Sequence, residues 1–304
     1  YLLFRMCKSK GIKVITLEWA KFGGRTLICQ EIDRADGLDN MNIVSSENTR
    51  TFEELKGYLK KNKPYSGFES KPTKKLSKLK KLKDFSLFLL NPINSDYQKM
   101  YVNYGKSKWN LLTKGSRTSL KIKKNLAQNF FDKNLKNKID EQQPFLFFSL
   151  QSEPERDLLV LAPYYSDQIT IIKQIAKSLP VGYKLFVKDH PIMSEIGWRN
   201  IEYYKQIMAL PNVTLLHPSI KSNEIIKKCS VVLTIAGTPG FEALFEQKPV
   251  IVFSDIDYSV LPSVLRVQKI EDLPILIRSA LKLKVESSSL DKFVKIIDKS
   301  SIYF

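Results

Sequence analysis

Short apolar runs alternate with segments of helical period along the second half of the chain. Each predicted strand is an apolar run of about five residues, and each predicted helix repeats its apolar residues every three or four positions. The predicted strands are 145–150, 183–188, 211–216, 231–235 and 249–253. The predicted helices are 167–178, 198–209, 222–228, 240–246 and 273–283. This alternation indicates an α/β fold with a parallel, doubly wound sheet.

The first half of the chain has a less regular pattern. Gly11 predicts the C-cap of a short helix at the start, and residues 12–17 predict a strand. Thr51 and Glu54 form a capping-box signal, which predicts a helix over 51–62. Glycine-bearing residues between the strand and this helix indicate a loop at the strand's C-terminal end.

The middle of the chain is polar and basic. Helical periodicity returns over 76–90 with a lysine-rich outer face, and 103–140 predicts helices plus a linker. Because the alternating strand and helix signals begin just afterwards, we place a domain boundary near residue 142. Residues 286–304 are expected to form a C-terminal tail.

Length and composition set the broad class of protein. The 304 residues, 43% of them hydrophobic, are enough for two packed domains. No apolar run approaches the roughly 18–20 residues that cross a bilayer, and the first residues lack the features of a signal peptide. Because the sequence begins without Met, we expect a fragment with an incomplete N-terminal domain. Three scattered cysteines give neither a disulfide framework nor a metal spacing, so we expect a reducing cytoplasm.

The positive charge is concentrated in one segment. The net charge is +18, and residues 51–140 hold 22 Lys and Arg against 7 Asp and Glu. Such a surface attracts nucleic acid, anionic lipid headgroups or an acidic glycan, and a solvated lysine-rich surface is an equal alternative. Nucleic acid is the least favoured partner, because no stacking aromatic residues recur with the basic ones.

Charged residues follow the predicted strand 183–188. Lys188, Asp189 and His190 end this strand, and Pro191 stiffens the turn after them. In open α/β sheets, ligands bind at the C-terminal edge of the strands. A lysine and a histidine that titrates near neutrality suit the phosphates of a ligand, whereas the alternative is a plain charged turn. His217, the other histidine, also follows a strand and is a secondary candidate.

A glycine turn joins the predicted strand 231–235 to a helix. Gly237 and Gly240 let the backbone approach a ligand closely, and Thr238 adds a hydroxyl group. The N–H groups at the start of the new helix favour an anion such as a phosphate. Glu242 can accept hydrogen bonds from ribose or sugar hydroxyls, or it can act only as an acid in the first turn of the helix.

Further acidic residues lie in two predicted loops. Gln151, Glu153 and Glu155 follow the first strand of the second domain, where paired carboxylates can bind hydroxyls or act as acid or base. Glu18 lies in the corresponding loop of the N-terminal half and would face the same cleft. The sequence contains no phosphate-loop motif, no GxSxG motif and no cluster of metal ligands.

At these residues the chain resembles the capsule polysaccharide biosynthesis family, the relatives of bacterial Kdo transferases of surface-glycan assembly. The likeness covers residues 144–259 well and 12–25 more weakly, and the basic middle matches almost nothing. The residues that carry it are Leu150, Gln151, Glu153, Pro154 and Glu155, then Lys188, Asp189, His190 and Pro191, then Leu210, Pro211, Asn212 and Val213, and finally Gly237 to Ala243 and Lys248 to Val250.

The resemblance implies a GT-B arrangement, in which two Rossmann-like domains face a cleft. An acceptor-side domain over 1–142 would oppose a nucleotide-sugar domain over 143–285. The donor, with CMP-Kdo as one candidate, is a substrate, so neither a cofactor nor a metal is expected. The implied donor-binding residues are Gln151, Glu153, Glu155, Lys188, His190, Pro191, His217, Gly237, Thr238, Gly240 and Glu242. Glu18 and His190 are the catalytic candidates.

Three classes of function remain open at this stage. The leading hypothesis is a metal-independent cytoplasmic glycosyltransferase, peripheral to the inner membrane, that extends a glycan or glycolipid acceptor. A nucleotide-sugar epimerase of similar architecture would turn over the donor without an acceptor. A non-catalytic carbohydrate or membrane adaptor would tolerate the loss of His190.

Overall fold

The computed structural model describes residues 2–20, 25–32, 38, 49–62, 116–135, 137–139, 142–196 and 198–303. The chain divides into two compact units, one of residues 1–66, 131–191 and 199–304, and a smaller one of residues 67–130 and 192–198. This division differs from a cut near residue 142, and that boundary stays a prediction. The predicted helix over 76–90 lies outside the described residues. In the smaller unit, the structure describes the first part of α6 (Ser116–Asn134) and α8 (Met193–Ile196).

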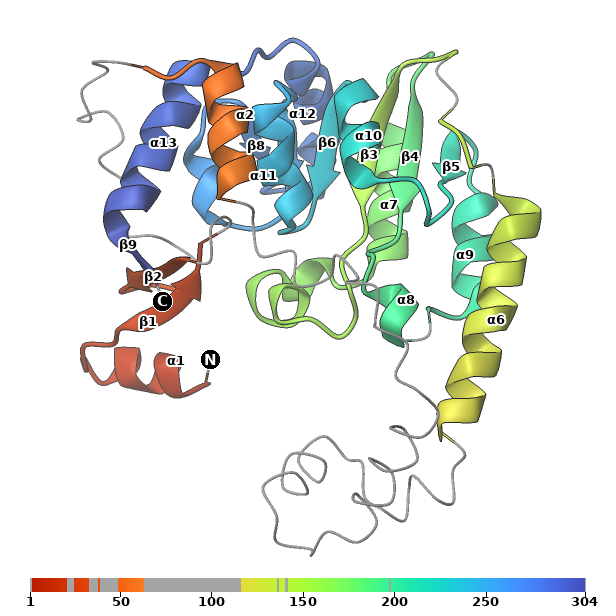
Figure 1. The fold of residues 1–304 in the computed structure, drawn as a ribbon, viewed down its shortest axis with the longest axis horizontal. Helices are drawn as coiled ribbons and strands as arrows, with labels where there is room; N and C mark the ends of the chain where they lie inside the picture. The colour runs from red at the N-terminus through yellow and green to blue at the C-terminus, as the bar shows by residue number, and fades with distance from the viewer. Residues whose placement is uncertain are drawn as a thin grey trace, which may run out of the picture. The chain divides into compact units, whose positions relative to one another are not determined.

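A six-stranded parallel sheet forms the centre of the larger unit (Figure 1). Its strands are β3 (Phe145–Ser149), β4 (Lys184–Lys188), β5 (Val213–Leu215), β6 (Val231–Thr234), β7 (Val250–Val252) and β8 (Val264–Arg266). The spatial order is β5-β4-β3-β6-β7-β8, so the chain steps outward from β3 and then returns to its other side. This is the strand order of the Rossmann fold, and it confirms the predicted α/β class.

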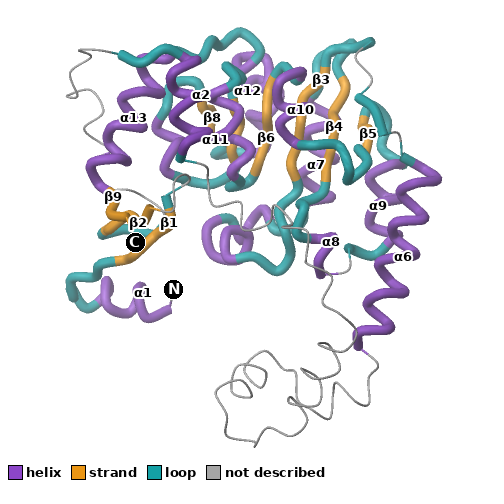
Figure 2. The backbone as a smooth tube through the Cα atoms, viewed as in Figure 1, coloured by secondary structure: helices purple, strands orange, loops and turns teal. Residues whose placement is uncertain are grey.

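Every residue of β3 is buried, as expected for a strand with both faces covered. The helices of the larger unit are α1 (Leu2–Ser9), α2 (Phe52–Lys61), α7 (Gln168–Ser178), α9 (Ile201–Met208), α10 (Ser222–Lys228), α11 (Thr238–Phe245), α12 (Leu273–Ala280) and α13 (Ser287–Ser300). On one face of the sheet, α10 and α11 join Phe147, Phe186 and Val232 in a single buried cluster. On the opposite face, α7 and α12 contact each other (Figures 1 and 2).

The N-terminal elements form a second, antiparallel sheet. Its strands are β1 (Thr16–Trp19), β2 (Arg25–Cys29) and β9 (Ser301–Tyr303), in the order β1-β2-β9. The predicted strand therefore begins later than residue 12, and Glu18 lies within β1 rather than in a loop. The strands described before residue 142 make this hairpin, so a second Rossmann-like domain with its own parallel sheet stays a prediction.

We expected the residues after 285 to form a tail, and this prediction is wrong. They form α13 and β9 instead. Leu290, Phe293, Val294 and Ile297 of α13 are buried in the same cluster as α2. Arg50, just before α2, forms an ion pair with the buried Asp291 of α13. The predicted capping box at Thr51 is confirmed and starts α2. Within the described ranges, no helix has the length and apolar character needed to cross a bilayer.

Candidate functional site

The candidate site lies at the C-terminal ends of β3 and β6, where the strand order reverses. Such a switch point opens a crevice in which ligands of α/β folds bind. Gln151 follows β3 and is 3% exposed, and its side-chain amide lies 3.0 Å from Oγ1 of Thr234 at the end of β6. With its oxygen toward Thr234 and the Gly237 N–H, this amide also donates to Glu155 Oε2 at 3.2 Å. The structure thus brings Gln151 and Glu155 together.

The glycines of the turn are required for packing within the protein. Gly237 and Gly240 both have ordinary backbone conformations, so no positive φ explains them. A Cβ atom at Gly237 would lie 2.6 Å from the Gln151 amide and 2.7 Å from Thr234 Oγ1. A Cβ atom at Gly240 would lie 2.5 Å from the Tyr258 hydroxyl, which donates to the Gly237 carbonyl at 2.6 Å. The sequence argument, based on close approach to a ligand, missed this internal cause.

The N-terminus of α11 points its first turn toward this edge of the sheet. Gly237 is the N-cap residue and supplies no side-chain hydrogen bond to the helix, and Thr238 at the first helical position is exposed. The N–H groups of a first helical turn have no partner within the helix, and the helix dipole favours negative charge beside them. Pro239 has no N–H group, and the Gly240 N–H donates to the Gly237 carbonyl oxygen at 3.3 Å. The predicted phosphate contact at this turn therefore rests on Thr238 and stays a prediction.

Lys188 brings a buried cation to the same edge. It is 4% exposed, and burial lowers the pKa of its ammonium group, with Asp189 opposing that shift. Among the described residues, no hydrogen bond or ion pair engages this ammonium. Ser149, Lys188 and Thr234 are register partners on β3, β4 and β6, so their side chains share one face of the sheet. An anion at this face would compensate the buried charge.

His190 differs from the prediction that it titrates near neutrality. Burial, together with the positive charges of Lys188 and Arg199, lowers its pKa from 6.5 to about 4. The imidazole is therefore neutral at pH 7 and can donate or accept a hydrogen bond, but it adds no positive charge. Pro191 follows in an exposed turn, as expected.

Arg199 is the central buried cation of the site, and sequence reasoning missed it. Its Nε atom lies 3.3 Å from Asp189 Oδ1, its Nη1 atom lies 2.7 Å from Glu153 Oε1, and it also donates to the Gln151 carbonyl oxygen. Asp189 in turn accepts a hydrogen bond of 2.5 Å from the Tyr204 hydroxyl. These contacts make Asp189 and Glu153 supports that fix the loops after β3 and β4. The sequence held no periodic signal for Arg199, because its partners are distant along the chain.

Glu242 on α11 is the carboxylate best suited to a ligand. The side chain is half-buried, and burial raises its pKa from 4.5 to about 7. No hydrogen bond or ion pair to another described residue compensates this burial. A carboxyl group in this state can accept a hydrogen bond from a ligand hydroxyl or exchange a proton near neutral pH.

Glu18 and His217 are held by other protein groups. The Glu18 carboxylate lies 3.0 and 3.1 Å from Nη1 of Arg156, which directly follows Glu155. The expectation that Glu18 faces a cleft between two domains stays a prediction. His217 is 4% exposed, and its two ring nitrogens lie 3.0 Å from Asp132 and 2.6 Å from Ser219. These partners make His217 a brace between the β5 loop and the end of α6.

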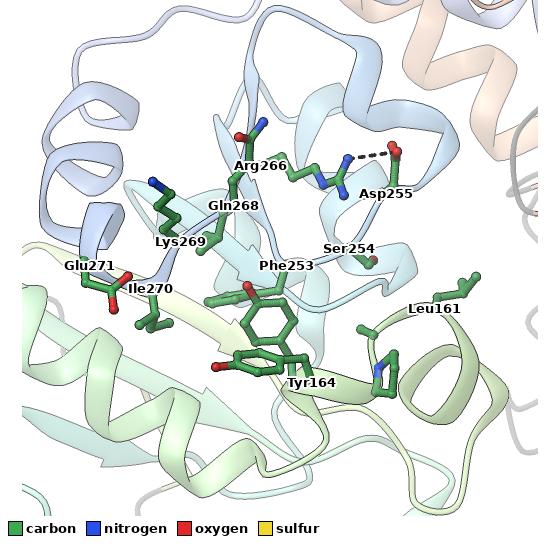
Figure 3. A pocket seen from close by; sticks show the side chains of 14 residues that line it. Leu161, Tyr164, Phe253, Ser254, Asp255, Arg266, Gln268, Lys269, Ile270 and Glu271 are labelled. Carbon is green, nitrogen blue, oxygen red and sulfur yellow. Dashed lines mark ion pairs between the residues drawn. The ribbon is translucent and has the colours of Figure 1, made fainter.

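A cavity of about 550 Å³ beside β7 and β8 was not found from the sequence (Figure 3). Phe253 and Ser254 follow β7, Val267 and Gln268 follow β8, and Tyr164 and Tyr165 come from a short helix after β3. The segments that line the cavity are short and far apart in the sequence, so no local sequence motif marks them. The Ser254 hydroxyl donates to the Ile235 carbonyl at 2.7 Å, which joins this cavity to the turn that leads to Gly237.

Comparison with known proteins places the chain in a family. Residues 71–261 match the family described as capsule polysaccharide biosynthesis protein. The match starts further toward the N-terminus than the resemblance suggested, because it includes much of the basic middle. No curated protein matches the chain.

The solved structures that match the chain are distant in sequence. KpsC, the beta Kdo 2,7 transferase of Thermosulfurimonas dismutans, is 14% identical over 66% of this chain and 56% of that chain, with a TM-score of 0.37. UDP-GlcNAc 2-epimerase of Methanocaldococcus jannaschii is 16% identical over 59% and 51% of the two chains, with a TM-score of 0.34. Heptosyltransferase II of E. coli is 13% identical over 52% and 51%, with a TM-score of 0.35.

This chain thus spans between 51% and 56% of the length of these three structures. The family match covers well over half of the chain and includes the glycine turn, Lys188 and the Gln151 loop. The protein therefore belongs to the capsule polysaccharide biosynthesis protein family.

Proposed function

We propose that this protein is a glycosyltransferase that moves a sugar from a nucleotide sugar to a growing capsule or other surface polysaccharide. The observation that carries the proposal is the buried Lys188 ammonium, which has no hydrogen-bond or ion-pair partner among the described residues and shares a sheet face with the switch point. Family membership supports a role in polysaccharide assembly, and the site supports a phosphate-bearing ligand.

In this proposal the donor diphosphate or phosphate lies between Lys188 and the N-terminus of α11. Lys188 neutralises one phosphate oxygen, and the backbone N–H and hydroxyl of Thr238 contact another. The neutral His190 contributes a hydrogen bond. Positive groups placed where charge develops stabilise a leaving phosphate. Because the protein supplies these groups itself, the proposal does not call on a metal or a cofactor.

Glu242 holds a hydroxyl of the donor, from its ribose or from its sugar. A ligand hydroxyl that donates to Glu242 stabilises the charged carboxylate and lowers its pKa from about 7. CMP-Kdo, the donor that the resemblance implies, is the first nucleotide sugar to test. Glu18, which forms an ion pair with Arg156, remains the candidate base on the acceptor side.

The basic segment over 51–140 is proposed to hold the protein at an anionic membrane surface or an acidic acceptor. Its excess of Lys and Arg supports this part of the proposal. Most of the segment lies outside the described residues. Flotation with vesicles that contain anionic lipid, at low and high salt, tests it: salt-sensitive binding is expected, and no binding to any vesicle would contradict it.

The test of the donor site is calorimetric titration of CMP, UDP and GDP and of their sugar conjugates. Wild type is expected to bind one nucleotide, and Lys188→Met is expected to lose most of that affinity. Lys184→Met, a change at the other end of β4, is the matched control and should bind normally. Failure of wild type to bind any nucleotide would contradict the proposal. Turnover of a bound donor without any acceptor would instead favour the epimerase alternative.

A further inference from the structure

The cavity beside β7 and β8 has an aromatic floor. The Phe253 ring lies 5.2 Å from the Tyr165 ring, and the Tyr164 ring meets Tyr165 edge-on at 5.5 Å and 86°. Tyr164 is 86% exposed, so most of its ring surface is open to solvent. Figure 3 shows Tyr164 and Phe253 in the middle of the cavity wall. One ring face is therefore available to a ligand.

Polar side chains surround this floor. The side chains of Gln268, Lys269 and Glu271 form no hydrogen bond or ion pair with another described residue, and Figure 3 shows them along one side. Across from them, Arg266 forms an ion pair of 2.8 Å with Asp255. The rim thus offers an amide, a cation and an acid that are not already paired. Such sets of donors and acceptors beside apolar surface are typical of small-molecule sites, which measure about 300–1,000 Å³.

We propose that this cavity binds a saccharide unit of a glycan chain. A sugar ring presents one C–H face, which packs on an aromatic face that carries partial negative charge, while its hydroxyls both donate and accept hydrogen bonds. A nucleobase is less well served, because the two tyrosine rings are perpendicular and do not form a flat slot. A phosphate fits less well too, because the rim has no net positive charge. It carries two cations, Arg266 and Lys269, and two acids, Asp255 and Glu271.

The position of the cavity indicates which saccharide it holds. The hydrogen bond from Ser254 to the Ile235 carbonyl places the cavity beside the strand that leads to the Gly237 turn. A glycan bound here would pass close to the donor phosphate, so we assign it as a sugar of the acceptor chain. This assignment rests on the proposed function, whereas saccharide binding in the cavity does not.

The experiment is saturation-transfer NMR and calorimetry of the full chain with short neutral and acidic oligosaccharides, namely malto-, chito- and galacturonate oligomers. Wild type is expected to bind at least one of them. Tyr164→Ala is expected to weaken binding about tenfold, the factor that corresponds to the packing of one aromatic ring. Because Tyr164 is exposed, this change should leave folding intact, which thermal denaturation checks.

Two further variants complete the design. Gln268→Ala should weaken saccharide binding as well. Tyr183→Ala, just before β4 and three strands away from β7, should not. Nucleotide affinity should stay the same in all three variants. No oligosaccharide binding to wild type, or binding that Tyr164→Ala leaves unchanged, would overturn the proposal. Saccharide binding without nucleotide binding would keep this site and contradict only the proposed donor site.

Discussion

The Nε atom of Arg199 lies 3.3 Å from Oδ1 of Asp189, and both side chains are almost fully buried. Burial raises the pKa of Asp189, and the guanidinium opposes that shift. Arg199 also holds Glu153, so one residue connects the loops that follow β3 and β4. The stability of the candidate site therefore depends on a cation that does not itself contact the proposed ligand.

We expect Arg199→Leu to lower the free energy of unfolding by about 3–5 kcal/mol, because Asp189 would be left as an uncompensated buried charge. A carboxyl whose folded pKa is raised is most stabilising below its unfolded pKa, near 3.8, and loses that stability as pH rises. The deficit of the variant should thus be largest at neutral pH and shrink toward pH 4. Urea denaturation at several pH values measures it. Lys205→Ala, which breaks an exposed pair with Glu202, should cost less than about 1 kcal/mol.

Lys188→Met should change stability and binding in opposite directions. The buried ammonium has a lowered pKa, so its charge disfavours the folded state. We expect the methionine variant to gain about 0.5–2 kcal/mol of stability at neutral pH while it loses nucleotide affinity. In wild type, this cost should fall as pH approaches 10.5, the ordinary lysine value, because the unfolded chain then releases the same proton. A variant that is both less stable and fully able to bind nucleotide would contradict the assigned role.

Glu242→Gln should flatten the pH dependence of stability between pH 4.5 and 7. The folded pKa of about 7 lies above the ordinary 4.5, so the folded protein holds the proton longer. Its stabilisation is complete below pH 4.5 and is lost as pH rises through 7, by about 3 kcal/mol in total. His190, with a folded pKa of about 4, acts in the opposite sense between pH 4 and 6.5. The comparison of denaturation curves for wild type and Glu242→Gln therefore isolates Glu242, and equal slopes would contradict the raised pKa.

Gly240→Ala should destabilise the protein by about 1–3 kcal/mol, because its Cβ atom would overlap the Tyr258 hydroxyl. Gly57→Ala, within α2, is the matched control: no atom lies within 4 Å of its Cβ position. That change should stabilise the protein by about 0.5–1 kcal/mol through helix propensity. Combination of Gly240→Ala with Tyr258→Phe should cost less than the sum of the two changes, since the shortest contact, with the hydroxyl, is removed, whereas the contact of 2.9 Å with Thr234 Cγ2 remains. Thermal denaturation of the four variants provides the test.

Local patterns were sufficient for five of the six strands of the parallel sheet, all except β8. The buried run at 145–149 and the charged end of β4 appear in the sequence because apolar side chains and the residues after them are neighbours along the chain. The same holds for the capping box at Thr51. The position of the glycine turn was predicted correctly, but the reason given for its glycines was incomplete. Only the structure shows that the Tyr258 hydroxyl lies against Gly240.

Long-range partners explain the rest. Arg199 contacts residues 10 and 48 positions away, and no periodicity marks such a hub. β8 has only three residues, too few for a sequence pattern, and it is defined as a strand by its pairing with β7. α13 does carry helical spacing at Leu290, Phe293, Val294 and Ile297, so the expectation of a tail overlooked a readable signal.

The pairing of β9 with β2 has a consequence for biosynthesis. Leu27 pairs with Ser301, so the hydrogen bonds along one edge of β2 cannot form until β9 has been synthesised. While the ribosome is still adding the residues between them, β2 presents an open strand edge, the kind of surface that recruits other chains. Nascent chains that stall before residue 301 should therefore be especially dependent on chaperones.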